Sequence, residues 1–239
     1  MNETALQRKY YADTAARYEE MHVEEQDEHF FALGFLAASV EYLKIQSILD
    51  IGSGTGRAIR YIKRRCPGIR IVGVEPVPEL REQAYKLGVA HDEIVDGDAL
   101  KLVYKDGAFD LVCAFGVLHH VKTPNVAIAE MLRVAAKAIF ISDANNFGQG
   151  SYVPRSIKQL INAFGLWGVA NLIKTRGKGY IYTEGDGVSY SYSVFNNYDQ
   201  IKKSCDIHLF NTIGDGKHAY KDASHVALLA VMRDRKQGA

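Results

Sequence analysis

Short apolar runs alternate with helix-compatible stretches along the middle of the chain. Runs that are apolar at successive positions, such as residues 111–115, are typical of strands buried on both faces. Alternation of such strands with helices predicts an α/β fold, in which helices cover both faces of a mostly parallel sheet. The last two runs are separated by the turn-rich segment 214–224, which favours a hairpin at one sheet edge. The expected strands are residues 47–51, 69–74, 93–95, 109–115, 138–142, 207–213 and 225–232.

Composition is that of an ordinary globular protein and narrows the classes of partner. The 239 residues are 47% hydrophobic and 24% charged, which argues against extended disorder and against a membrane-spanning fold. The formal net charge of +1 excludes a surface that is basic throughout, as a general nucleic-acid binder would have. Three scattered cysteines and a charged N-terminus predict a reduced, cytoplasmic protein without a disulfide framework.

A glycine-rich segment follows the first predicted strand and precedes a helix. Gly52, Gly54 and Gly56 permit a tight turn and let a ligand approach the backbone closely. Glu75 ends the next strand, where an acidic side chain can accept hydrogen bonds from ribose hydroxyls. These features predict a nucleoside-containing cofactor. The fingerprint of dinucleotide sites fails at its last glycine, which is Arg57 here, so a nicotinamide-dependent oxidoreductase is disfavoured.

Four sequence elements, in order, resemble those of the class I S-adenosylmethionine-dependent methyltransferases. They are Leu-Asp-Ile-Gly-Ser-Gly-Thr-Gly at 49–56, Val-Gly-Val-Glu-Pro at 72–76, Asp-Gly-Asp-Ala at 96–99 and Phe-Asp-Leu-Val-Cys-Ala-Phe-Gly-Val-Leu-His-His-Val at 109–121. The resemblance covers about residues 45–145 and is closest to the branch of quinone-biosynthesis and other small-molecule enzymes. It implies a Rossmann-like, seven-stranded, mostly parallel sheet with helices on both faces, an N-terminal helical flap and an inserted lid.

The resemblance implies a single methyltransferase domain over residues 1–239. Residues 1–46 would form the N-terminal helical flap, and residues 47–143 the cofactor-binding core. Residues 144–198 would form the acceptor lid, and residues 199–239 a final helix with an antiparallel strand pair. The lid segment is the least regular part of the chain, and long irregular segments inside a domain are usually functional.

The same resemblance implies contacts with S-adenosylmethionine, whose product is S-adenosylhomocysteine. The glycine loop would line the methionine part, Glu75 would hold the ribose hydroxyls, and Asp98 would accept a hydrogen bond from the adenine amino group. Two flap tyrosines lie where family members cover the cofactor, and helix packing accounts for them equally well. The implied cofactor residues are Asp50, Gly52, Ser53, Gly54, Gly56, Glu75, Pro76, Asp98, Ala99, Phe115, Gly116, Tyr11 and Tyr18.

Candidate acceptor-side residues follow the fourth strand and continue into the lid. His119 and His120 come directly after that strand, and histidine is the natural base near neutral pH; in the resembled family the pair also serves as a structural turn. We expect no catalytic metal, because the fourth strand ends in Gly116 rather than in clustered carboxylates. Aromatic lid side chains suit a ring-shaped acceptor. The predicted acceptor residues are Asn145, Trp167, Arg176, Tyr180, Tyr182, Tyr190 and Tyr192.

Together these features predict methyl transfer from S-adenosylmethionine to a small-molecule acceptor, at oxygen, by in-line displacement. The alternatives are a tRNA or other RNA methyltransferase, and a protein that binds the cofactor without turnover.

Charge is distributed unevenly along the chain. Residues 1–150 carry 17 basic and 21 acidic side chains, whereas residues 151–239 carry 12 and 7. The basic lid, with Arg176 and Lys178, predicts an anionic acceptor. We expect a monomer or homodimer that binds no DNA. Contact of the apolar lid stretch, residues 156–174, with a membrane or a partner is an alternative to simple packing.

Overall fold

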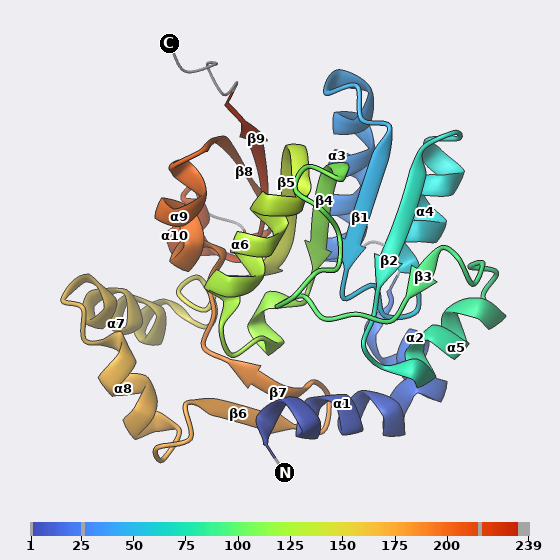
Figure 1. Cartoon of the computed structure of the whole chain (residues 1–239). Coiled ribbons are helices and arrows are strands. Elements are labelled where there is room, and N and C mark those ends of the chain that lie inside the picture. The colour runs from blue at the N-terminus through green and yellow to red at the C-terminus, as the bar shows by residue number, and fades with distance from the viewer. Residues whose placement is uncertain (1, 25–26, 215–216, 234–239) are drawn as a thin grey trace.

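The computed structural model describes residues 2–24, 27–214 and 217–233. Its centre is a sheet with the strand order β3-β2-β1-β4-β5-β9-β8 (Figure 1). Neighbouring strands are parallel except that β9 runs antiparallel to both β5 and β8. This confirms the predicted seven-stranded, mostly parallel sheet. Its strands are β1 (Ser47–Ile51), β2 (Arg70–Val74), β3 (Ile94–Val95), β4 (Phe109–Phe115), β5 (Ala135–Ala144), β8 (Cys205–Gly214) and β9 (Ala223–Met232).

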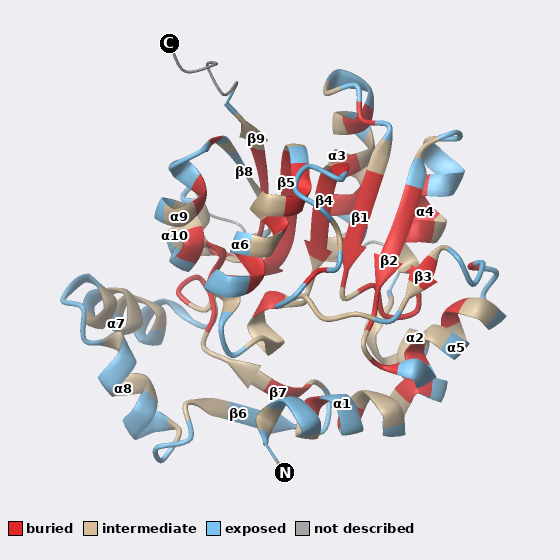
Figure 2. Cartoon of the chain, in the orientation of Figure 1, coloured by how far each residue is buried: buried red, intermediate tan, exposed pale blue. Residues whose placement is uncertain are grey.

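The sheet has a hydrophobic core on each face, which explains the continuous apolar runs. In β4, Leu111 and Cys113 face one core, whereas Val112 and Ala114 face the other. Because side chains alternate between the faces of a strand, a strand covered on both sides must be apolar at every position. Figure 2 shows the buried residues concentrated in the strands and in the helix faces against them.

Helices from both ends of the chain cover these faces. Leu33 of α3 and Ile62 of α4 belong to one core, while Met131 of α6 and Ile201 of α9 belong to the other. The helices are α1 (Glu3–Thr14), η1 (Ala15–Arg17), α2 (Tyr18–His22), α3 (Glu28–Tyr42), α4 (Arg57–Arg65), α5 (Pro78–Lys86), η2 (Leu118–His120), α6 (Pro124–Val134), α7 (Tyr152–Ala163), α8 (Trp167–Lys174), η3 (Val194–Asn197), α9 (Tyr198–Lys202) and α10 (Ala219–Asp222).

Local sequence explains where several helices begin. The Asn2 side chain accepts a hydrogen bond from the Ala5 N–H (2.8 Å), and Asp27 caps α3 in the same way. Pro78 and Pro124 are the first residues of α5 and α6, where the missing N–H costs nothing. The apolar stretch 156–174 lies on two helices, α7 and α8, because Gly165 adopts a positive φ of 71° between them.

Two separate segments lie across the carboxyl ends of the parallel strands. The lid forms a small antiparallel hairpin of β6 (Tyr180–Thr183) and β7 (Gly187–Tyr190). Helix α1, from the other end of the chain, packs against β7 beneath the sheet (Figure 1). The functional end of the fold is therefore covered from two sides.

We expect Gly148→Ala to destabilise the protein by about 1–3 kcal/mol. A Cβ there would lie 1.9 Å from the carbonyl oxygen of Ala223, where the lid departs beside β9. Thermal unfolding measures the effect as a fall in Tm of about 2–4 °C per kcal/mol. Gly168→Ala in α8 is the control, because nothing lies within 4 Å of its Cβ position. A Gly148→Ala protein with the Tm of the unaltered chain would contradict this account.

Candidate active site

Two adjoining cavities open at the carboxyl ends of the strands. The larger has a volume of about 640 Å³ and the smaller about 160 Å³. They adjoin, because six residues line both of them. The wall that they share consists of Tyr11, Tyr18, Gly52, Phe115, Gly116 and His120.

The glycine loop after β1 approaches its neighbours too closely for larger residues. A Cβ on Gly52 would lie 2.5 Å from a methyl carbon of Val117, and φ at Gly52 is +66°. Gly54 has φ +55° and faces the Tyr18 hydroxyl, which a Cβ would approach to 3.2 Å. The N–H groups of Gly52 and Ser53 donate to the carbonyl oxygen of Val74 (2.8 and 3.1 Å), so what the glycines provide is close access to the backbone rather than unpaired donors.

The third glycine of the loop has a different task. Gly56 lines neither cavity; with φ +78° it is the N-cap of α4 and packs on Val89. This corrects its expected cofactor contact. Arg57 follows it and forms two hydrogen bonds of 2.6 Å with the Asp27 carboxylate. The arginine that breaks the dinucleotide fingerprint therefore ties α4 to the start of α3.

Two buried carboxyl groups flank the glycine loop. Glu75 accepts hydrogen bonds from the N–H groups of Gly54 (3.0 Å) and Val77 (2.9 Å) and lines the smaller cavity. Burial raises the pKa of Glu75 to about 7, and it also raises the pKa of Asp50, which lines the larger cavity, to about 7. Both groups thus change charge near neutral pH.

The smaller cavity continues past the end of β3. Pro76, Asp98 and Ala99 line it, and Arg8 of α1 forms an ion pair of 2.7 Å with Asp98 across its rim. Twelve of the thirteen predicted cofactor residues line one of the two cavities, with Gly56 the exception.

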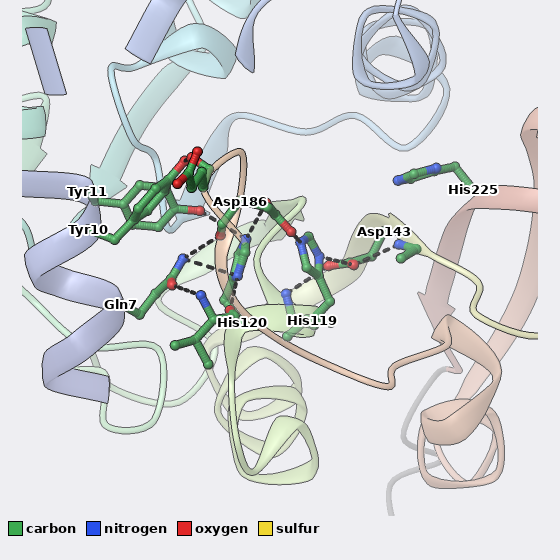
Figure 3. Close-up of polar contacts among 12 residues, drawn as sticks. Gln7, Tyr10, Tyr11, His119, His120, Asp143, Asp186 and His225 are labelled. Atoms are coloured by element: carbon green, nitrogen blue, oxygen red, sulfur yellow. Dashed lines mark hydrogen bonds and ion pairs between the residues drawn. The ribbon is translucent and has the colours of Figure 1, made fainter. Parts of the chain in front are cut away.

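A buried ion-pair network follows β4. The Asp143 carboxylate is fully buried at the end of β5 and lies 2.7 Å from His119 Nδ1. Asp186, from the turn of the lid hairpin, lies 3.7 Å from His119 Nε2 and 3.4 Å from His120 Nε2 (Figure 3). Burial alone would lower the pKa of His119, but Asp143 and Asp186 outweigh it and raise that pKa to about 10. His119 is therefore a cation held between two carboxylates.

His120 has the opposite character. Its Nδ1 lies 2.6 Å from the carbonyl oxygen of Val188, so this nitrogen carries the proton and donates. Its Nε2 then accepts from the Tyr11 hydroxyl at 2.9 Å. Burial and the charge of His119 lower the pKa of His120. The result is a neutral imidazole with its basic nitrogen at the wall shared by the two cavities.

Side chains of α1 fasten the lid hairpin over this site. The Gln7 amide donates to the carbonyl oxygen of Asp186 (3.2 Å) and accepts from the Val188 N–H. The Tyr10 hydroxyl donates to the carbonyl oxygen of Glu184 at 3.1 Å. These bonds hold the backbone of the turn and so set the position of the Asp186 carboxylate.

Two of the seven predicted acceptor residues line the larger cavity. Tyr190 lies at the end of β7, and Tyr192 is buried with its hydroxyl donated to Asn197 Oδ1 at 3.1 Å. Sequence reasoning missed other lining residues, including Asn146, Lys174 and Asp186. Asp186 stands in an Asp-Gly turn, whose sequence predicts only a turn.

The structure corrects the expectation for Asn145 and Trp167, which lie outside both cavities. Asn145 is fully buried, and its amide donates to the carbonyl oxygens of Ala219 (3.0 Å) and Ala223 (2.8 Å). Trp167 donates from Nε1 to Ser191 Oγ at 2.8 Å. Both side chains hold the lid together rather than meet a ligand.

The same correction applies to the three remaining predictions. Tyr180 and Tyr182 lie on β6, where Tyr182 is exposed and packs its edge against Tyr10, and neither lines a cavity. Arg176 is exposed on the turn after α8. Lys174 is the lid cation that does reach the larger cavity.

Among the described residues, His119, His120 and Asp186 form the one group whose ligand atoms could together hold a metal, within 4.8 Å of one another. A metal there would have to displace a proton from His119, and it would have to displace the Tyr11 hydroxyl from Nε2 of His120. Because these atoms already have partners, a metal-free site stays our prediction.

The strand order, the glycine loop and the buried acid at the end of β2 define a class I S-adenosylmethionine-dependent methyltransferase fold. Residues 49–139 match the family model described as "Methyltransferase domain". That part of the chain therefore carries the domain of this family. Its residues also fit the cofactor of the class, since the loop glycines leave a cradle that a Cβ would fill and Glu75 faces the smaller cavity.

Curated relatives agree over the core of the chain. Norajmaline N-methyltransferase of Rauvolfia serpentina is 39% identical over 98 residues, which cover 39% of this chain and 33% of the relative. Demethylmenaquinone methyltransferase of Deinococcus radiodurans is 37% identical over 91 residues, covering 36% and 37%. The alignments thus span about a third of the length of these relatives.

A solved structure shows the same fold over nearly the whole chain. Magnesium protoporphyrin IX methyltransferase from Synechocystis PCC 6803, with bound S-adenosylhomocysteine, has a TM-score of 0.59 and 14% identity. The match covers 95% of this chain and 98% of that one.

We expect the Kd for S-adenosylmethionine to rise as the pH falls through about 7, where the raised pKa of Glu75 lies. Below this pH Glu75 becomes protonated and is a poorer acceptor for ribose hydroxyls. The affinity should fall up to tenfold per pH unit for each carboxyl that must ionise on binding. Isothermal titration between about pH 5 and pH 8 measures this dependence.

The Glu75→Gln variant should bind S-adenosylmethionine more weakly at neutral pH. Its Kd should also depend less steeply on pH, by one proton released on binding. Glu79→Gln, an exposed acid on α5, is the matched control. A Glu75→Gln protein with the same pH profile as the unaltered chain would count against this role.

Proposed function

We propose that the protein transfers a methyl group from S-adenosylmethionine to a small-molecule acceptor at oxygen. The observation that carries this proposal is His120, a neutral imidazole whose Nε2 lies at the wall shared by the two cavities. A hydroxyl acceptor must lose a proton during transfer, and a base within hydrogen-bond reach assists this loss. The relatives named for small molecules support an acceptor of this size.

The side chains at the shared wall have different roles in the proposed transfer. When bound, S-adenosylmethionine supplies an electrophilic methyl group on a positively charged sulfur. The hydroxyl of Tyr11 occupies the basic nitrogen of His120 in the free protein, so an acceptor hydroxyl would replace it and give its proton to Nε2. Tyr11 and Tyr18 cover the wall and exclude water, which favours in-line displacement over competing reactions.

His119 acts through its charge rather than as a base. With a pKa of about 10 it stays protonated at neutral pH and cannot take a proton from the acceptor. Its charge lowers the pKa of His120, which keeps the second imidazole neutral. The two adjacent histidines thus have separate roles, one positioning and one basic.

The acceptor's ring and charge follow from the larger cavity. Tyr190 and Tyr192 offer flat apolar walls suited to a ring. Support for an anionic acceptor reduces to Lys174, since Arg176 and Lys178 are exposed outside both cavities. The carboxylates of Asp27, Glu28 and Asp186 also line this cavity, and they favour an acceptor whose methylated group is neutral.

We expect His120→Ala to lower kcat by about 10²–10⁴ while the Kd for S-adenosylmethionine stays within about twofold. The assay measures S-adenosylhomocysteine formed with a panel of phenols, hydroquinones and amines. In the unaltered protein, kcat should fall only below the ordinary histidine pKa, because that of His120 is lowered.

His91→Ala is the control, since His91 is exposed and stacks on Tyr85 away from both cavities. Equal turnover by His120→Ala and His91→Ala would show that His120 does not act as a base. Turnover of amines alone would move the acceptor atom from oxygen to nitrogen.

Chelation gives a further test of the metal-free mechanism. Treatment with EDTA should leave kcat unchanged, because the His119 ring nitrogens already have Asp143 and Asp186 as partners. Loss of turnover that added Zn²⁺ or Mg²⁺ restores would instead show that these residues hold an ion.

A further inference from the structure

The two lid helices carry an apolar surface that nothing in the described chain covers. Neither α7 nor α8 contains a buried residue. Figure 2 shows both helices in the intermediate and exposed colours and set apart from the sheet. Phe164 and Ile173 are 73% and 75% exposed. The large exposed apolar residues of this surface are Tyr152, Val153, Ile157, Leu160, Phe164, Leu166, Val169, Leu172 and Ile173.

Nine large apolar side chains exposed within residues 152–173 mark a contact site rather than ordinary exposure. Exposed apolar residues elsewhere, such as Tyr42 and Val103, are scattered among other elements. Here they recur along two consecutive helices joined at Gly165, whose positive φ turns one helix from the other. We call this surface, residues 152–174, the lid face.

Charge identifies what the lid face contacts. Residues 144–183 contain no Asp or Glu and five basic residues: Arg155, Lys158, Lys174, Arg176 and Lys178. Arg176 and Lys178 are exposed on the turn directly after α8. Apolar side chains bordered by cations are the composition of helices that lie in the interface of an anionic membrane.

The same charges argue against a second copy of this chain. Arg155 and Lys158 are already engaged, with Asp222 (3.7 Å) and with backbone carbonyl oxygens, which leaves Arg176 and Lys178 as exposed cations. A symmetric contact would bring the exposed cations of two copies close together, and like charges in contact are unfavourable. An anionic bilayer instead complements both the apolar residues and the cations. None of the helices in the described residues is long and apolar enough to cross a membrane, so the contact would be at its surface.

We propose that the lid face docks on the surface of an anionic lipid bilayer. The apolar side chains of α7 and α8 enter the interface while Arg176 and Lys178 meet lipid headgroups. Asn171, Lys174 and Ile181 line the larger cavity, so the docked lid brings the rim of that cavity to the lipid. Delivery of an apolar acceptor by this route rests on the proposed methyl transfer, whereas docking itself does not.

The test uses the full chain and two kinds of vesicle. One kind is phosphatidylcholine alone, and the other is phosphatidylcholine mixed with phosphatidylglycerol. Co-sedimentation measures the fraction of the protein that binds each kind of vesicle. We expect binding to the anionic vesicles that weakens as salt shortens the Debye length from about 30 Å at 0.01 M to about 8 Å at 0.15 M.

Two double variants separate the apolar and the charged contributions. Phe164→Ser with Ile173→Ser should weaken vesicle binding at least about tenfold, because each removes an inserted apolar side chain. Arg176→Gln with Lys178→Gln should weaken it about fivefold for each cation, or roughly 30-fold together, and should flatten the salt dependence.

Matched controls are taken from a loop remote from the lid. Val103→Ser removes an equally exposed apolar residue, and Lys101→Gln with Lys105→Gln removes two cations. These variants should bind vesicles as the unaltered chain does. Titration with S-adenosylmethionine checks that every variant is folded and keeps its cofactor cavity, so failed docking and failed methyl transfer are told apart.

Two outcomes would overturn the proposal. One is a failure of the unaltered chain to bind anionic vesicles, or binding that the lid variants and the control variants reduce to the same extent. The other is self-association of the unaltered chain that Phe164→Ser with Ile173→Ser abolishes without vesicles, which would assign the lid face to a second copy.

Discussion

The buried carboxylate of Asp143 organises the functional end of this protein. It accepts hydrogen bonds from the N–H groups of Leu118 and Ala144, both at 2.7 Å, and pairs with the His119 ring. A carboxylate buried without a partner is costly, so the loop after β4 must bring its N–H group and its histidine to this point. The charge thus placed on His119 attracts Asp186 from the lid. One interaction at the end of β5 therefore fixes the loop after β4 and draws the hairpin over the site.

Charged and neutral groups alternate across the site. Beside the cation of His119 lies the neutral imidazole of His120, and the glycine loop lies between the buried acids Asp50 and Glu75. This arrangement places acidic groups beside both cavities, while the unprotonated nitrogen of His120 accepts from the Tyr11 hydroxyl. Such preorganised charges act without rearrangement at the moment of reaction.

Sequence patterns predicted the sheet, and twelve of the thirteen residues proposed for the cofactor line the two cavities, because both depend on local signals. Apolar runs mark strands covered on both faces, and the glycines of the loop are required by backbone angles that the loop itself sets. The acceptor side was predicted poorly, since its residues meet only after folding. Nothing near Asp186 in the sequence indicates that it reaches His119, and Tyr180 and Tyr192 look alike in sequence although only Tyr192 lines the cavity.

The bonds from Gln7 to the hairpin backbone have a kinetic consequence. Because α1 covers the smaller cavity through Arg8 and holds the lid through Gln7, the two covers move as one gate. Cofactor exchange then requires the acceptor side to open as well, so spent cofactor and methylated product leave in the same opening event. The rate of that opening would then set the upper limit on kcat.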